Sequence, residues 1–87
     1  MSDYLLLKWG TYKRINAESE AMKKMVDDID SRGLTWSLGG MHEVMTDEKK
    51  KAFCDLIDSC EGTIQNDWDG KIYTKEQAKF YIMEYRV

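Results

Sequence analysis

The sequence of residues 4–12 reads Tyr-Leu-Leu-Leu-Lys-Trp-Gly-Thr-Tyr, a run rich in apolar and aromatic side chains. The run is too short for a useful helix, and its composition is typical of a strand. Because Leu5 to Leu7 do not alternate with polar residues, we expect both faces of this strand to be covered. Gly10, inside the run, indicates a bulge or a close backbone approach. This stretch therefore predicts a sheet on which the rest of the chain packs.

Three later segments carry apolar residues at the spacing of an amphipathic helix, and each follows a residue that can cap a helix N-terminus. These segments are 17–32 after Asn16, 47–61 after Thr46, and 75–86 after Thr74. Gly33 and Gly62 are expected to end the first two helices, and Gln77 completes a capping box with Thr74 in the third.

Short strands are expected at residues 34–38, 63–66 and 71–73. The first leads into a turn at Gly39-Gly40, after which 41–45 is either a returning strand or a loop. The other two form a hairpin around the turn signal Asp69-Gly70. The predicted fold is α+β: a small sheet of three to four short strands packed with three helices, in a single compact domain over residues 1–87.

The size and charge of the chain limit its function class. The 87 residues are 43% hydrophobic and 33% charged, which allows one domain with a modest core and excludes a large multi-substrate enzyme. A net charge of -3 gives no general attraction to nucleic acid. The longest apolar run is far below the roughly 20 residues of a membrane helix, and no signal-peptide pattern is present. We therefore expect a soluble cytoplasmic protein with neither membrane nor direct nucleic-acid partners.

Residues 65–76 partly match the calcium-binding loop of an EF-hand. The residues that fit the motif are Asp67, Asp69, Gly70 and Glu76. Gln65 occupies the first position, where the motif has a carboxylate that sets affinity. An Asp-Gly turn followed by a capped helix explains the same residues, so calcium binding is the minor alternative.

Catalytic and zinc-binding patterns are weak in this chain. Cys54 and Cys60 lie six residues apart on a predicted helix, so the two thiols cannot face one ion. Nucleophilic catalysis needs a base beside the nucleophile, and no spacing places Cys54 or Ser37 against His42, the single histidine. We expect neither an enzyme nor a cofactor.

Aromatic residues are the broader functional signal. Three Trp, five Tyr and two Phe are more than one small core needs, and Trp36 and Trp68 stand next to turns. Exposed aromatic residues beside charges are typical of a recognition surface. The residues expected to bind a partner are Trp36, Asp67, Trp68, Asp69 and Tyr73. The alternative is that Trp36 and Trp68 belong to the core.

A second functional hypothesis is an oligomer that sequesters a nucleotide signal. Tryptophan would stack on the base, and Lys8, Lys13 or Arg14 would contact the phosphate. A domain this small has little interior, so the ligand would have to be enclosed between subunits of a homo-oligomer.

The chain resembles small uncharacterised accessory proteins encoded by tailed bacteriophages. The residues that carry the resemblance are 5–11 (Leu-Leu-Leu-Lys-Trp-Gly-Thr), Asn66-Asp67-Trp68 with Gly70, and Thr74-Lys75-Glu76 with Ala78-Lys79 and Tyr85. No activity is attached to these proteins. The resemblance implies an inhibitor that binds a host protein in the host cytoplasm, such as an anti-phage defence component. An acidic turn centred on Trp68 would suit a basic groove, for example that of a defence nuclease.

Overall fold

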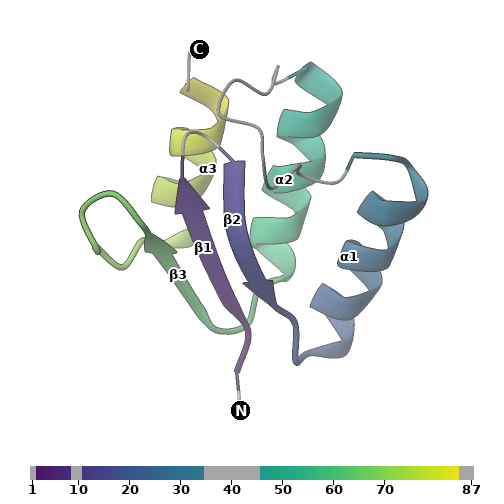
Figure 1. Cartoon of the computed structure of the whole chain (residues 1–87), viewed down its shortest axis with the longest axis horizontal. Coiled ribbons are helices and arrows are strands. Elements are labelled where there is room, and N and C mark those ends of the chain that lie inside the picture. Colours follow the sequence, from purple (N-terminus) through teal and green to yellow (C-terminus); the bar gives the residue numbers. More distant parts are fainter. Residues whose placement is uncertain (1, 9–10, 35–45, 85–87) are drawn as a thin grey trace.

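A three-stranded sheet forms one layer of the computed structural model, which describes residues 2–8, 11–34 and 46–84 (Figure 1). The elements in chain order are β1 (Tyr4–Lys8), β2 (Thr11–Asn16), α1 (Glu20–Ser31), α2 (Asp47–Ser59), β3 (Thr63–Asn66) and α3 (Lys75–Glu84). The strand order is β2-β1-β3, with β1 antiparallel to β2 and parallel to β3. The predicted α+β class, with three helices and a small sheet, is confirmed.

The predicted single strand over 4–12 is wrong. The chain forms two antiparallel strands here, and β2 continues through a polar stretch in which the sequence pattern indicated no strand. A bulge occurs, but it lies opposite Leu6 and Leu7, because Leu6 pairs with Arg14 whereas Leu7 pairs with Tyr12. Gly10, where the bulge was expected, lies outside the described residues.

The leucines of β1 are buried on one face of the strand only. Leu5 and Leu7 are each 1% exposed, whereas Leu6 between them is half-buried. The expectation that both faces are covered is therefore wrong for the described chain. Neighbouring side chains of a strand point to opposite faces. The three described helices lie on one side of the sheet (Figure 1), and Leu5 and Leu7 belong to the core that these helices form with the sheet.

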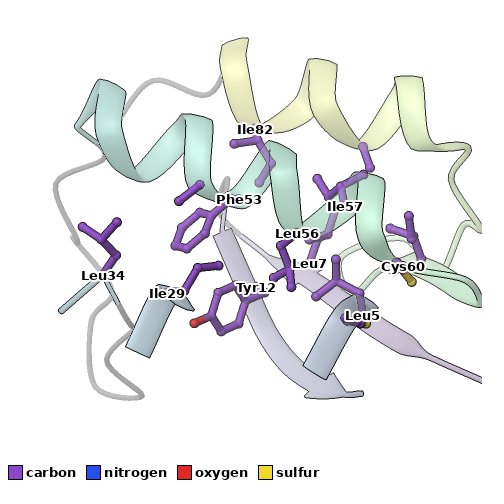
Figure 2. Close-up of a cluster of buried hydrophobic side chains, with 14 residues drawn as sticks. Leu5, Leu7, Tyr12, Ile29, Leu34, Phe53, Leu56, Ile57, Cys60 and Ile82 are labelled. Atoms are coloured by element: carbon purple, nitrogen blue, oxygen red, sulfur yellow. The ribbon is translucent and has the colours of Figure 1, made fainter. Parts of the chain in front are cut away.

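The core lies between this face of the sheet and the helices. α2 lies between α1 and α3 and packs against both. Phe53, Leu56 and Ile57 of α2 point toward the sheet or toward α3 (Figure 2) and are at most 1% exposed. The Phe53 ring meets the Tyr12 ring edge-on at a centroid distance of 5.0 Å, which joins α2 to β2. Cys60 is buried in the same cluster.

The helix boundaries follow local capping chemistry. Ser19, not Asn16, caps α1, because Asn16 is the last residue of β2 and the Ser19 hydroxyl accepts from the backbone N–H of Met22. Thr46 caps α2 as predicted, and Gly33, at φ +70°, follows the C-terminus of α1 as predicted. The capping box of α3 is confirmed. Its two hydrogen bonds run from the Thr74 N–H to the Gln77 side chain and from the Gln77 N–H to the Thr74 hydroxyl.

A buried carboxylate ties the N-terminal segment to two distant connections. Asp3 is 1% exposed, and its oxygens accept from the backbone N–H groups of Glu18, Ser19 and Glu61 and from the Ser19 hydroxyl, each at 2.7 Å. Burial alone would raise the pKa of Asp3, but these four hydrogen bonds outweigh it and hold the pKa well below its usual range.

Gly62 has a different role from the one predicted. α2 ends at Ser59 with Cys60 as its cap, so Gly62 lies beyond the helix and does not end it. A Cβ atom at Gly62 would overlap the backbone carbonyl of Asp3, which accepts a hydrogen bond from the N–H of Thr63 at 2.9 Å. Glycine is required here because two backbones approach closely.

Two other predicted strands have different outcomes. Leu34 is a buried residue just after α1, and the remainder of the predicted strand 34–38 lies outside the described residues, as do Gly39-Gly40 and 41–45. The hairpin after α2 is confirmed in reduced form. β3 is followed by a turn, and the returning segment pairs through one antiparallel bridge, between Gln65 and Ile72.

Candidate functional site

The turn over residues 66–70 connects β3 to the segment that returns toward α3, and Asn66 organises it. The buried Asn66 side chain accepts from the N–H of Trp68 at 2.7 Å and donates to the Tyr73 hydroxyl at 3.0 Å. The Asn66 carbonyl also accepts from the N–H of Gly70, which has φ +74°. Only a residue that tolerates the left-handed region closes such a turn without strain, which explains the glycine.

Further hydrogen bonds hold the turn from both sides. The N–H of Asp67 donates to the Leu7 carbonyl at 2.8 Å, so the turn continues the pairing of β1 with β3. The Asp69 side chain accepts from the N–H of Lys71, and the Gln65 amide donates to the Gly70 carbonyl. The backbone of this turn is therefore ordered by the fold itself.

Trp68 projects from this ordered turn into solvent. Its side chain is 77% exposed, and Ile72, four residues later, is 62% exposed. The alternative that Trp68 is a core residue is therefore wrong. Exposed tryptophan contributes little to folding, but it buries a large apolar area at low entropic cost when a partner covers it.

The carboxylate of Asp67 is paired with lysines of the sheet. Its Oδ2 lies 3.1 Å from Lys13 Nζ and 3.5 Å from Lys8 Nζ. The hydrogen bond from Lys13, supported by the charge of Lys8, lowers the pKa of Asp67 below its usual range. The turn is therefore less acidic than its sequence indicates, because two strand lysines compensate the charge of Asp67.

The other residues expected to bind a partner have different positions. Asp69 is exposed in the same turn as Trp68. Tyr73 is half-buried, its hydroxyl accepts from the Asn66 side chain and its ring meets the Tyr81 ring edge-on at 6.1 Å, so it helps to hold the turn and is only partly exposed. Trp36 lies outside the described residues. The structure thus brings Asp67, Trp68 and Asp69 together.

Asp67 and Asp69, which match ligand positions of the EF-hand loop, face different partners in the structure. Asp67 turns to Lys8 and Lys13, and Asp69 accepts from the backbone N–H of Lys71. Within the described part of the chain, no three His, Cys, Asp or Glu side chains are placed to hold one metal ion. The geometry gives calcium binding no support.

Among the described residues, the pocket beside Asp3 is not built for a nucleotide. Lys8 and Lys13 are directed at Asp67, and a shallow pocket of about 150 Å³ is lined by Ser2, Asp3, Glu18, Ser19 and Glu61. Carboxylates dominate that lining, and Asp3 is fully hydrogen-bonded, so the pocket suits neither a phosphate nor a base.

The cysteines are poorly suited to nucleophilic chemistry. Both are free thiols, and burial raises the pKa of each above its usual value. A thiol with a raised pKa holds little thiolate at neutral pH, and thiolate is the reactive form. His42 lies outside the described residues.

Several residues of the site have roles that no sequence signal indicates. The pattern of residues 63–66 predicts a strand and gives Asn66 no role in the turn, although Asn is a common turn former. The sequence offers Lys8 and Lys13 as phosphate contacts and not as partners of Asp67, since no local signal links residues more than fifty positions apart. Ile72 falls on the predicted returning strand, which indicates no surface role.

Comparison of the chain with protein-family models, with curated proteins and with solved structures gives no match. Among the described helices, none has the length and apolar character needed to cross a membrane. The functional conclusion therefore depends on the geometry of the turn.

Proposed function

We propose that this chain is a small non-enzymatic accessory protein that binds another protein through the turn bearing Trp68. The observation that carries the proposal is an indole 77% exposed on a turn whose backbone is held by hydrogen bonds. Binding then orders few groups that were mobile before, so little of the free energy gained by burying the Trp68 side chain is lost as conformational entropy. Ile72 extends the apolar surface.

The class of partner in this proposal comes from the resemblance to phage-encoded accessory proteins. Such a chain would bind a host protein, in particular an anti-phage defence component, and inhibit it by occupying a surface. Among the described residues, no three His, Cys, Asp or Glu side chains are placed to hold one metal ion, and burial raises the pKa of both free thiols. The inhibition would be stoichiometric, since the binder supplies surface and no chemistry.

The test is capture of a partner with the tagged full chain from lysate of a bacterium that tailed phages infect. We expect one protein in stoichiometric amount, lost with Trp68→Ala. The matched control is Phe80→Ala, which removes an aromatic side chain of similar exposure, 68%, from α3. Both variants should keep the wild-type melting temperature, because neither ring is buried.

The measurement that completes the test uses the captured protein in purified form. Titration calorimetry should give a one-to-one complex with wild type and with Phe80→Ala, and at least about a tenfold weaker complex with Trp68→Ala. A captured protein that binds equally to all three, or no stoichiometric protein in any lysate, contradicts the proposal.

A further inference from the structure

The sheet has one face that none of the described helices covers. Leu5, Leu7 and Ile64 point into the core, so the alternate residues of β1 and β3 point to the opposite face. Tyr4 and Gln65 are joined on this opposite face by a hydrogen bond from the Tyr4 hydroxyl at 2.8 Å, and both are half-buried.

One row of residues crosses this face from edge to edge. Leu6 pairs with Arg14 of β2 and with Gln65 of β3, and Gln65 pairs with Ile72 beyond β3. Residues paired directly across neighbouring strands project to the same side, so these four form a continuous cross-strand row. We call it the Arg14 row. Its Ile72 end lies two residues beyond the turn that bears Trp68, so the row ends beside the proposed binding site.

The charge of this face is opposite to that of the whole chain. β1 and β2 carry the cations Lys8, Lys13 and Arg14 and no carboxylate, in a chain of net charge -3. Asp67 pairs with Lys8 and Lys13, whereas no described carboxylate pairs with the exposed Arg14. An excess of positive charge is therefore left next to the apolar Leu6.

We propose that the Arg14 row receives a segment of the partner protein that carries carboxylates beside apolar or aromatic side chains. A carboxylate would pair with Arg14, whose planar guanidinium suits two parallel hydrogen bonds, while an apolar side chain would cover Leu6 and Ile72. This inference rests on the proposed function and reverses one expectation: the contacted surface is acidic rather than a basic groove.

Nucleic acid fits the face less well than an acidic protein segment does. Binding to a phosphate backbone depends on several cations acting together, and here Asp67 offsets one of the two positive charges of Lys8 and Lys13. A short segment with one or two carboxylates needs only the local excess at Arg14.

The probe is a fluorescein-labelled random copolymer of glutamate and tyrosine, titrated with the full-length chain at low salt and followed by anisotropy. We expect saturable binding that Arg14→Glu weakens by about tenfold. The matched control is Lys24→Glu, the same change of charge at an exposed lysine of α1, which should change binding by less than about twofold. Arg14→Gln should weaken binding less than Arg14→Glu does, and circular dichroism checks that each variant is folded.

Three outcomes overturn the inference. If Lys24→Glu weakens copolymer binding as much as Arg14→Glu does, or if the copolymer does not bind at all, the Arg14 row is not a site for an acidic segment. Binding of labelled oligothymidine with the same dependence on Arg14, and not of the copolymer, reassigns the face to nucleic acid.

Partner capture separates this inference from the proposed function. A partner lost with Trp68→Ala but kept with Arg14→Glu leaves the proposed function standing and refutes the acidic-segment inference. A partner lost with both variants and kept with Lys24→Glu supports the two together. The absence of any stoichiometric partner contradicts the proposed function but does not test the Arg14 row, because the copolymer titration measures binding at that row separately.

Discussion

Replacing Asp3 by Asn should destabilise the fold by an amount that depends on pH. The carboxylate accepts four hydrogen bonds at 2.7 Å, two at each oxygen. An amide leaves one oxygen as an acceptor and puts an NH₂ group where the other oxygen received two donors. Hydrogen bonds to a charged group contribute about 1.5–3 kcal/mol each, so losing two should cost about 3–6 kcal/mol.

That loss is a large part of the stability of the chain. Small domains are stable by about 0.05–0.15 kcal/mol per residue, so the variant keeps only a reduced margin near neutral pH. Urea unfolding at neutral pH, followed by far-UV circular dichroism, measures the free energy of unfolding. Asp69→Asn makes the same chemical change at an exposed carboxylate that accepts one hydrogen bond, and it should cost less than about 1 kcal/mol.

The pH dependence has a definite sign. Asp3 has a pKa of about 3.9 in the unfolded chain and well below that in the folded protein, so folding favours its ionised form. Its stabilisation is complete above about pH 4 and is lost progressively as the pH falls below that value. The difference in unfolding free energy between wild type and Asp3→Asn should therefore shrink between about pH 4 and pH 2.5. A difference that stays constant over this range would refute the role of the charge.

Three further changes test the fold and the site. Gly62→Ala should lower the free energy of unfolding in urea by about 1–3 kcal/mol, because its Cβ overlaps the backbone of Asp3. The control is Gly33→Ala, whose Cβ meets no other atom, so that only the strain of the positive φ lowers the stability. A smaller loss with Gly62→Ala than with Gly33→Ala would contradict the predicted clash. Thr74→Ala should cost about 1 kcal/mol by removing the N-cap of α3, and an unchanged unfolding midpoint would argue against the capping box. Leu56→Ala should lower the free energy of unfolding by about 2–5 kcal/mol, whereas Trp68→Ala should change it by less than about 0.5 kcal/mol, as measured by thermal and urea unfolding. An equal loss in both variants would mean that Trp68 is buried.

The three helices could be read from the sequence, but two of their ends could not, because Ser19 rather than Asn16 caps α1 and α2 ends before Gly62. Amphipathic spacing and caps act within a few residues, which is why Thr46, Gly33 and the Thr74–Gln77 box are placed as predicted. The strand pattern was less informative, because the burial of a strand face depends on which helices cover it. Three consecutive leucines in β1 therefore predicted two covered faces where the described structure has one.

The turn shows the same division between local and distant chemistry. Asp69-Gly70 predicted a turn because the positive φ of Gly70 is a local requirement. The charge state of Asp67 could not be predicted in this way. Lys8 and Lys13 reach it only because β3 pairs with β1, on the side opposite β2.

The sequence by itself determined the α+β class, the three helices and the turn around Trp68, since each depends on residues close together in the chain. Tertiary structure alone decided that Asp3 is the buried link between three segments and that Gly62 must lack a side chain. It also decided that the face carrying Arg14 is positive within an acidic chain. Pairing and close approach between distant residues set these features, and their energies depend on distances that no local pattern encodes.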